Sequence, residues 1–287
     1  MSKRIVGKSI KVLLFALGAI CLLFCIVFFS AKDERTLLRT NDNLFFAHRG
    51  QATKAAENSL EAIALAIEDG YTAIELDVRF SKDGKAMLFH DDNLMRLCKI
   101  KKSIEETESP ELQTINLYFD NKKTENTIAD LETVFKQYPN LIYYLDIKEP
   151  TLKNLDIIAN LIDKYSMQQN TIVAHANFIS HLFHRIKFPH IISCNEGFNS
   201  GKEWILKVLP RNLQTDYYAG FIEKTDKKQM DKLRDWGLAN KKIAYSVNES
   251  NIEKAIKEYG LHHVIIDLKE PQNYFQDSIK ENKETIH

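Results

Sequence analysis

The feature that most restricts the fold of this chain is a regular alternation of short apolar runs with stretches of helical periodicity. Strands are predicted at 44–47, 73–80, 86–90, 141–147, 171–175, 190–194, 243–247 and 263–267. Helices are predicted at 59–69, 129–138, 151–165, 177–187, 202–209, 226–236 and 250–259. This α/β alternation predicts a parallel sheet, and eight strands predict a (β/α)₈ TIM barrel. An open doubly wound sheet is the alternative, but no G-x-G-x-x-G motif follows the first strand.

Three local patterns set the register of the barrel, which we place at residues 44–272. The N-S-L-E sequence at 58–61 is typical of a capped helix start, and Gly70 ends that helix. Asp83-Gly84 lies between two alternating segments and indicates a tight hairpin. Residues 97–127 are charged and weakly periodic, so we expect an insertion in a barrel loop that forms part of a lid or wall.

An uncharged apolar run at 12–31 precedes the barrel. Its 20 residues would span about 30 Å as a helix, which matches a bilayer core. Residues 1–11 carry four cations and no acid, so the positive-inside rule predicts a cytoplasmic basic tail and places the rest of the chain after the apolar run on the extracytoplasmic side. A cleaved signal peptide is the alternative, but Phe28-Phe29 before Ser30-Ala31 makes a poor cleavage site. We therefore expect a single-pass transmembrane anchor, a polar tether at 32–43 and a polar C-terminal tail at 273–287.

Charge and cysteine content exclude some functions. Lys+Arg and Asp+Glu both total 39, and this balance argues against a nucleic-acid binder. Outside the apolar run only Cys98 and Cys194 occur, and without a C-x-x-C motif they do not indicate a zinc site. They either pair in an oxidising compartment or remain two buried thiols.

Polar residues collect where predicted strands end, which is where barrel enzymes place catalytic groups. The first strand ends in His48-Arg49-Gly50, the second carries Glu75 and Asp77 on one face, and the third ends in His90-Asp91. The fourth strand carries Asp146 and Lys148 on one face. Because buried charges need a partner or a metal, several inward carboxylates predict a bound cation.

Residues 46–96 resemble the start of a glycerophosphodiester phosphodiesterase domain. The matching elements are H-R-G, E-N before an apolar helix, I-E-L-D-V, K-D-G and H-D, in the family's order and spacing. LDIK at 145–148, AYSVN at 244–248 and IID at 265–267 extend the resemblance. Ala56 stands where the family has Pro, Asp146 where it has a metal-binding Glu, and Tyr245 where it has Trp.

The resemblance implies a metal-dependent phosphodiester hydrolase. Glu75, Asp77 and Asp146 are the expected ligands of one divalent cation, Ca²⁺ or Mg²⁺, because hard cations prefer oxygen ligands. His48 and His90 are the expected acid–base pair on opposite sides of the phosphorus, with a substrate hydroxyl as a possible first nucleophile.

Four further residues are expected to support this site. Arg49 and Lys148 are expected to bind the substrate phosphate. Glu57 is expected to orient Arg49 or a ligand, with helix capping as the alternative, and Tyr245 to form an aromatic wall or pack in the core.

A second group of histidines, at 175, 181 and 184, has a spacing that could suggest zinc. We interpret His181 and His184 instead as a polar helix face, and His175 as a strand-end residue with a possible role near the substrate.

The favoured function is hydrolysis of glycerophosphodiesters to glycerol phosphate and an alcohol in lipid metabolism, with a small-molecule or lipid-derived phosphodiester as substrate. A phospholipase D-like hydrolase of lysophospholipids and a non-catalytic membrane-anchored binding barrel are the alternatives. A sugar-phosphate isomerase or aldolase would need a Schiff-base Lys or a phosphate loop near the last strands, and residues 243–267 show neither. The sequence does not indicate an oligomeric state.

Overall fold

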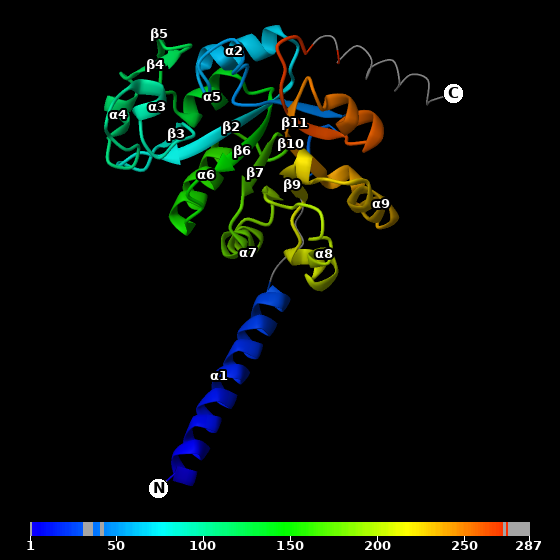
Figure 1. Ribbon diagram of the computed structural model, residues 1–287. Coiled ribbons are helices and arrows are strands. Elements are labelled where there is room, and N and C mark those ends of the chain that lie inside the picture. The colour runs from blue at the N-terminus through cyan, green and yellow to red at the C-terminus, as the bar shows by residue number, and fades with distance from the viewer. Residues whose placement is uncertain (1, 31–36, 41–42, 272–273, 275–287) are drawn as a thin grey trace.

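A long N-terminal helix and a barrel make up the chain in the computed structural model, which describes residues 2–30, 37–40, 43–271 and 274 (Figure 1). Helix α1 (Ser2–Ser30) contains an 18-residue segment, Ser9–Ile26, with a mean hydropathy of 2.5. None of the residues in this segment is buried. Its length and composition suffice to cross a membrane, although a signal sequence near an N-terminus has the same properties. Apart from Tyr274, the predicted tail at 273–287 lies outside the described residues, as does most of the predicted tether at 32–43.

Eight parallel strands close into the barrel that the sequence predicts. They are β1 (Leu44–Ala47), β2 (Ala73–Phe80), β6 (Ile142–Ile147), β7 (Thr171–His175), β8 (Ile192–Asn195), β9 (Tyr217–Phe221), β10 (Lys242–Asn248) and β11 (His263–Asp267). The sheet order is β1-β11-β10-β9-β8-β7-β6-β2, and pairing of β1 with β2 closes the ring. The (β/α)₈ prediction is therefore confirmed, with the helix-bearing loops arranged around the strands (Figure 1).

Two strand assignments from the sequence are wrong. Residues 86–90 do not form a barrel strand, because β3 (Ala86–Leu88) pairs antiparallel with β2 as the second arm of the hairpin at Gly84. The alternating pattern of a hairpin arm cannot be distinguished from that of a barrel strand by periodicity alone. The eighth barrel strand is β9, whose sequence YYAGF carries Gly220. This position requires glycine, since a Cβ there would lie 2.5 Å from the Phe198 carbonyl oxygen.

The predicted helices form, with shorter bounds, on the outside of the barrel. They are α2 (Leu60–Glu68), α5 (Leu131–Gln137), α6 (Leu152–Lys164), α7 (Phe178–Lys187), α8 (Ile205–Val208) and α9 (Lys227–Asp235). Short 3₁₀ turns occur at η1 (Arg211–Leu213), η2 (Ile222–Lys224) and η3 (Ala239–Lys241), and a π turn, η4 (Lys254–Glu258), stands within the predicted helix 250–259. Helix α2 begins at Ser59, whose hydroxyl accepts a hydrogen bond from the Ala62 amide at 3.0 Å.

The segment predicted as an insertion carries its own small structure. It contains α3 (Met95–Cys98), α4 (Ser109–Leu112) and the antiparallel pair β4 (Asn116–Phe119) and β5 (Lys122–Thr127). A separate apolar cluster that includes Phe89, Cys98 and Leu117 packs beneath it. Cys98 and Cys194 are both buried and free, which matches the alternative of two buried thiols.

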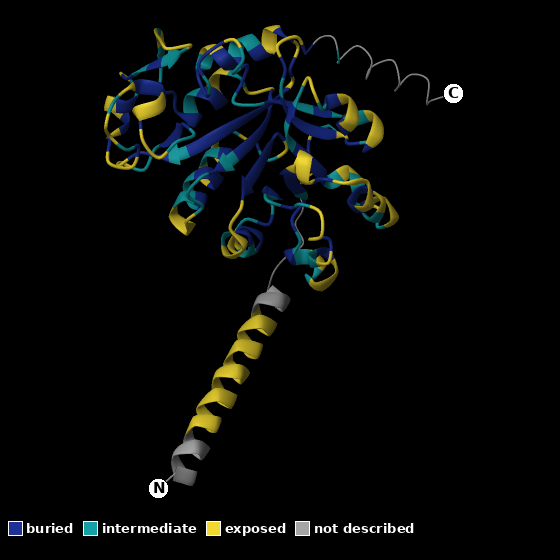
Figure 2. Cartoon of the chain, viewed as in Figure 1, coloured by how far each residue is buried: buried dark blue, intermediate teal, exposed yellow. Residues whose placement is uncertain are grey.

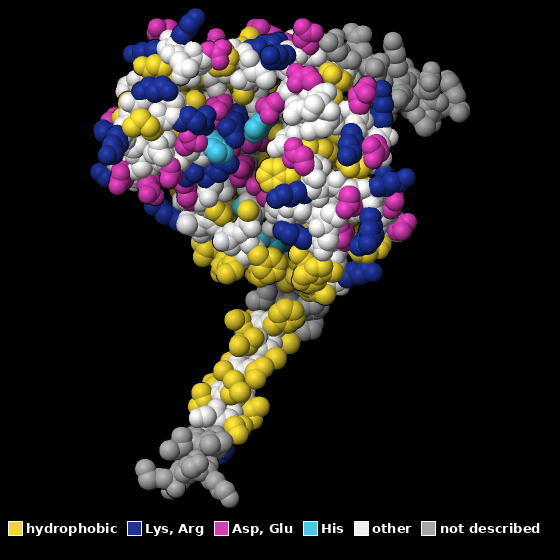
Figure 3. Space-filling view, viewed as in Figure 1, with side chains coloured by type: hydrophobic (Ala, Val, Ile, Leu, Met, Phe, Trp, Pro, Cys, Tyr) yellow, Lys and Arg dark blue, Asp and Glu magenta, His cyan; other side chains and the backbone are white. Residues whose placement is uncertain are grey.

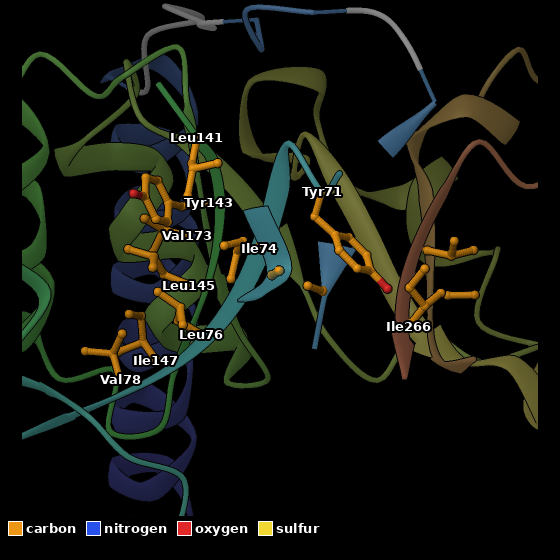
Figure 4. Close-up of a cluster of buried hydrophobic side chains, with 14 of the residues drawn as sticks. Tyr71, Ile74, Leu76, Val78, Leu141, Tyr143, Leu145, Ile147, Val173 and Ile266 are labelled. Carbon is orange, nitrogen blue, oxygen red and sulfur yellow. The ribbon is translucent and has the colours of Figure 1, made fainter. Parts of the chain in front are cut away.

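The core lies in two layers, one on each side of the barrel wall, and the barrel strands are mostly buried (Figure 2). Ile74, Leu76 and Val78 point outward to the helices (Figure 4), while Phe46, Tyr144 and Ile172 belong to the cluster that fills the barrel. Because side chains alternate along a strand, Glu75 and Asp77 of β2 point to the inner side. The barrel wall thus holds two carboxylates among apolar neighbours.

Candidate active site

A cavity of about 350 Å³ opens at the carboxyl ends of the barrel strands. It is lined by eight residues that the sequence singles out: His48, Arg49, Glu75, Asp77, His90, Asp146, Lys148 and Tyr245. Tyr144, Glu196, Phe221, Ser246 and Ile265 complete the lining and were not anticipated as site residues. Figure 3 shows histidine side chains beside acidic and basic ones in a recess on this face of the barrel.

Three carboxylates converge within this cavity. Glu75 and Asp77 come from β2 and Asp146 from the neighbouring strand β6, where Asp77 and Asp146 are register partners. One oxygen atom of each lies within 4.8 Å of the others. Burial, reinforced by the nearby charge of Asp77, raises the pKa of Glu75 to about 8, and burial also raises the pKa of Asp146. A buried set of oxygen ligands, in which burial opposes the ionisation of Glu75 and Asp146, fits a hard divalent cation.

Two cationic side chains contact the same carboxylates. The Lys148 Nζ lies 2.7 Å from Asp77 Oδ1 and also contacts Asp146, and the Arg49 Nε lies 3.0 Å from Asp77 Oδ2. Burial by itself would raise the pKa of Asp77, but the charges of Lys148 and Arg49 outweigh it and lower that pKa. Asp77 therefore stays ionised while Glu75 is readily protonated.

The His48 ring is held from one side by an acid at the end of the last strand. Its Nδ1 lies 2.9 Å from both carboxylate oxygens of Asp267, and its Nε2 lies 3.9 Å from Glu75 Oε2. Burial lowers the pKa of His48, but the Asp267 hydrogen bond and the Glu75 charge outweigh it, so the net pKa is raised. The Nδ1 contact leaves Nε2 as the nitrogen on the acidic side of the cavity.

The hairpin places His90 at the same cavity. Strand β2 continues past the barrel rim and β3 returns, so that the Phe89 amide donates to the Asp77 carbonyl at 3.1 Å. Arg79 Nε donates to the His90 carbonyl at 2.8 Å, and His90 Nδ1 lies 2.7 Å from Asp91 Oδ1. A return arm, not the end of a barrel strand, therefore positions His90.

A chain of ion pairs joins the surroundings of the two histidines. Arg49 Nη1 donates to Glu57 Oε1 at 2.8 Å, and Glu57 accepts from both terminal nitrogens of Arg96. Arg96 Nε in turn donates to Asp91 Oδ2 at 2.7 Å, next to His90. Glu57 thus contacts Arg49 and does not cap the helix, a role that belongs to Ser59.

Asn58 is a site residue that the sequence pattern concealed, because its motif indicates a helix start. Its side-chain amide donates to Asp77 Oδ2 at 2.8 Å, and its carbonyl oxygen accepts from the Asp77 amide at 3.0 Å. Asn58 is fully buried and has a φ of 59°, a conformation that asparagine tolerates better than most residues. Asn58 therefore fixes the orientation of one carboxylate of the acidic trio.

The far wall of the cavity combines a buried acid with aromatic rings. Tyr144 donates its hydroxyl to Glu196 Oε1 at 2.8 Å, and burial together with the Asp146 charge raises the pKa of Glu196 to about 8. Phe221 and Tyr245 form an edge-to-face pair with ring centroids 4.4 Å apart. Tyr245 thus lines the cavity and also packs against the apolar cluster inside the barrel.

The second group of histidines does not form a polar helix face, and that expectation is wrong. His175, His181 and His184 are all buried, because α7 turns this side toward β7 and β8. Burial lowers the pKa of His175 to about 4. Among the described residues, the acidic trio is the group of three or more ligand side chains that converges closely enough to hold a metal ion.

Comparison with known proteins places this geometry in a family. Residues 48–193, about half of the chain, match the model of the glycerophosphoryl diester phosphodiesterase family. A human lysophospholipase D, GDPD1, is 27% identical over 140 residues, which cover 46% of this chain and 45% of that protein. A mouse lysophospholipase D, GDPD3, is 26% identical over 136 residues, covering 45% and 41%. The matched stretch thus spans less than half the length of these relatives.

Solved structures share the fold. A phosphodiesterase from Oleispira antarctica, solved with the product sn-glycerol-3-phosphate, superposes with a TM-score of 0.70 at 22% identity, covering 83% of this chain and 97% of that one. A glycerophosphodiester phosphodiesterase from Thermotoga maritima gives a TM-score of 0.63 at 23% identity, covering 81% and 97%. At these identities the likeness establishes the barrel alone, whereas the family model covers both histidines, the acidic trio and Lys148. The chain belongs to the glycerophosphoryl diester phosphodiesterase family.

Proposed function

We propose that this protein hydrolyses glycerophosphodiesters to glycerol phosphate and an alcohol. The observation that carries the proposal is the convergence of three carboxylates, two histidines and two cationic side chains on one cavity. Phosphodiester hydrolysis requires these functions together, because charge on the phosphate oxygens must be neutralised while protons move on both sides of phosphorus. Family membership supports the same reaction class.

Glu75, Asp77 and Asp146 would hold one divalent cation, Ca²⁺ or Mg²⁺. When bound, the cation would supply charge neutralisation at the phosphate oxygens. The donor chemistry supports this assignment, since Glu75 and Asp146 have raised pKa values that a bound cation would reverse. Arg49 and Lys148, which contact the same carboxylates, would bind the phosphate from the adjacent side.

His48 and His90 would act as the acid–base pair. The Asp267 contact to Nδ1 keeps Nε2 of His48 available to take or give a proton, and Asp91 holds the Nδ1 of His90 in the same manner. With one histidine on each side of the bound phosphate, one would accept a proton from the attacking hydroxyl and the other would protonate the leaving alcohol.

The test is an assay of the full-length protein for glycerol phosphate release from a panel of glycerophosphodiesters, with and without EDTA. Activity should require the divalent cation, and His48→Ala and His90→Ala should each abolish it while the thermal unfolding curve stays cooperative. Absence of hydrolysis of every diester, with either cation present, would favour the non-catalytic binding barrel.

Lysophospholipids are the second substrate class that we propose. Two of the relatives, the human and mouse proteins above, are lysophospholipases D, and the far wall of the cavity carries the rings of Phe221 and Tyr245. A comparison of rates on water-soluble glycerophosphodiesters and on micellar lysophospholipids distinguishes the two classes.

The helix α1 would anchor the enzyme in a membrane as a single span. We propose the cytoplasmic tail at 1–11, the anchor at 12–31, the tether at 32–43, the barrel at 44–272 with its insertion at 97–127, and the tail at 273–287. Four cations before the apolar run support an extracytoplasmic barrel. Protease added to intact cells or spheroplasts should then digest the barrel, and an inverted orientation would protect it.

A further inference from the structure

An exposed apolar surface lies on helices α7 and α8, outside the active site. Residues 43–271 contain nine large apolar side chains that are exposed, and five of them are in these two short helices and their starts. They are Phe178, Ile179, Phe183, Trp204 and Val208, which we call the α7–α8 patch. Ile179, Trp204 and Val208 are 64%, 60% and 65% exposed. Figure 3 shows hydrophobic atoms gathered on the side of the barrel that faces α1.

The α7 and α8 parts of the patch meet at a shared pocket. Phe178 at the start of α7 and Ile205, Leu206 and Leu209 of the α8 region line one small apolar pocket of about 40 Å³. The two helices therefore share an apolar surface at their junction. Clustered exposed apolar groups of this kind mark contact surfaces, whereas single exposed apolar residues do not.

The exposed charged side chains of the two segments that carry the patch are all cationic. Residues 177–190 contain no acid, and in residues 197–215 the single acid is Glu203, which is buried and accepts from the Gly201 amide at 2.9 Å. The charged side chains exposed in these two ranges are Lys187, Lys202, Lys207 and Arg211, and Lys187 pairs with Asp156 of α6. An apolar surface with a tryptophan and a cationic rim is the composition that binds at the interface of an anionic bilayer.

The chain that leaves α1 joins the barrel at the start of β7, in the sector of the barrel that carries α7. Leu38 is buried, and the Arg39 amide donates to the Gln169 carbonyl at 2.7 Å. Gln169 lies two residues before Thr171, where β7 begins, and β7 leads into α7. Seven residues separate Ser30 from Leu38, and they can span at most about 25 Å. The end of α1 and the β7–α7 sector of the barrel must therefore stay near each other.

We propose that the α7–α8 patch lies on the surface of the same bilayer that α1 spans, so that the barrel contacts anionic phospholipid directly. The inference rests on the proposed membrane anchor and goes beyond it by assigning a second lipid contact. It also bears on the substrate, because Glu196 of the catalytic cavity and Phe198 of the patch pocket belong to the same loop after β8. Docking would hold the cavity mouth near lipid head groups and favour phosphodiesters that reside in the membrane.

The two tryptophans of the chain allow a direct test. Full-length protein with Trp236→Phe retains Trp204 as its one tryptophan, and Trp204→Phe retains Trp236, which is partly buried beside Lys207. Each variant is reconstituted into vesicles of equal parts phosphatidylcholine and phosphatidylglycerol, with plain or brominated acyl chains. The Trp204 emission should shift to shorter wavelength and be quenched by the brominated chains, to a much larger extent than the Trp236 emission.

Matched substitutions separate the patch from general lipid contact. In the Trp236→Phe background, Ile179→Ser with Val208→Ser should reduce the quenching of Trp204. Leu152→Ser, which removes an exposed apolar side chain from α6, should leave the quenching unchanged. Thermal unfolding of each variant verifies that the barrel is intact.

The outcomes distinguish the inference from the anchor on which it rests. A chain that fails to float with the vesicles overturns both the anchor and the docking surface. A chain that floats while Trp204 stays unquenched overturns the docking surface alone. If the Ile179→Ser and Val208→Ser substitutions instead convert a dimer to a monomer in sedimentation without affecting quenching, the patch joins two copies of the chain and the bilayer proposal is wrong.

Discussion

The Nδ1 atom of His48 lies 2.9 Å from both carboxylate oxygens of Asp267, although 219 positions separate the two residues in the sequence. Closure of the barrel produces this contact, because β1 and β11 pair in parallel with Ala47 opposite Ile266. The pair fixes the ring so that Nε2 lies on the side of Glu75. The first and last strands of the barrel therefore build one half of the proposed acid–base pair together.

Replacement Asp267→Asn should lower the pKa of His48. Burial already lowers that pKa, and the Asp267 hydrogen bond is the largest contribution that raises it. Nuclear magnetic resonance titration of the His48 ring should show a lower midpoint in the variant. Asp91→Asn removes the matching acid from His90 and should leave the His48 midpoint in place. An unchanged midpoint in Asp267→Asn would contradict the assigned contact.

The same pair should make stability depend on pH in a defined direction. A histidine whose folded pKa lies above its unfolded value of 6.5 stabilises the fold below that value and loses this effect as pH rises through the folded pKa. Asp267→Asn should therefore destabilise the protein more in acid than in alkali. Urea unfolding below pH 6.5 and above the folded pKa of His48 measures how much free energy of unfolding the variant loses at each pH. An equal loss at both pH values would exclude the linkage.

Loss of the Asn58 amide should weaken cation binding more than it weakens the fold. Asn58→Gly keeps a residue that accepts a φ of 59° but removes both hydrogen bonds to Asp77. Residues that orient a metal ligand typically contribute about 10- to 100-fold in affinity. Calorimetric titration with Ca²⁺ or Mg²⁺ measures the change.

A matched control exists for this substitution in the β4–β5 turn. Asn121 has a φ of 61° and is exposed, so Asn121→Gly relieves the same backbone conformation at a position remote from the acidic trio. Cation affinity should be unchanged in this variant. Equal affinities for Asn58→Gly and the wild type would mean that Asn58 has a structural role alone.

The barrel could be predicted from the sequence because most of its strands are apolar β-type runs followed by a capped or periodic helix. The two errors have a common cause, since periodicity describes a segment but not its partner. The hairpin arm β3 alternates like a barrel strand, and only its antiparallel pairing with β2 reveals its role. Strand β9 was missed although it is a barrel strand, and it carries Gly220, a residue that is uncommon in strands. The glycine is needed there because the Phe198 backbone approaches closely.

The site residues with charged side chains at strand ends could be predicted, but their supporting contacts could not. Glu196 follows β8 in a loop without any pattern that marks it, and only the folded barrel places it beside Tyr144 in the cavity. Asn58 was hidden because its sequence neighbours also specify a helix cap. Tertiary contacts of this kind leave no trace in local periodicity.

Stabilisation by divalent cations should increase with pH. The folded pKa of Glu75 is raised from 4.5 to about 8, so the cation-free protein loses stability as pH rises between those values. A cation binds the ionised form of the Glu75 carboxylate, so the cation-bound protein does not lose stability when that carboxylate ionises. The difference in Tm between samples with Ca²⁺ or Mg²⁺ and samples with EDTA should therefore be larger near pH 9 than near pH 6.

Glu75→Gln provides the control for this pH dependence. The amide has nearly the same shape but cannot ionise, so its cation-free Tm should vary less over the same pH range. A wild-type Tm difference that is constant with pH would show that Glu75 does not bind the cation as a carboxylate.

Gly50→Ala should destabilise the barrel and displace Arg49, whose amide donates to Glu75 Oε2 at 2.9 Å. Gly50 has a φ of 77°, and a Cβ there would lie 2.7 Å from the Ala62 carbonyl carbon of α2. Gly201→Ala is the control, because its φ is 90° but nothing lies within 4 Å of the added Cβ. Both substitutions place alanine in the left-handed region, which costs about 1 kcal/mol, and the overlap at Gly50 adds about 1–3 kcal/mol. Urea unfolding should resolve that difference, and equal losses would mean that α2 moves away freely and that the His-Arg-Gly turn is not tightly packed.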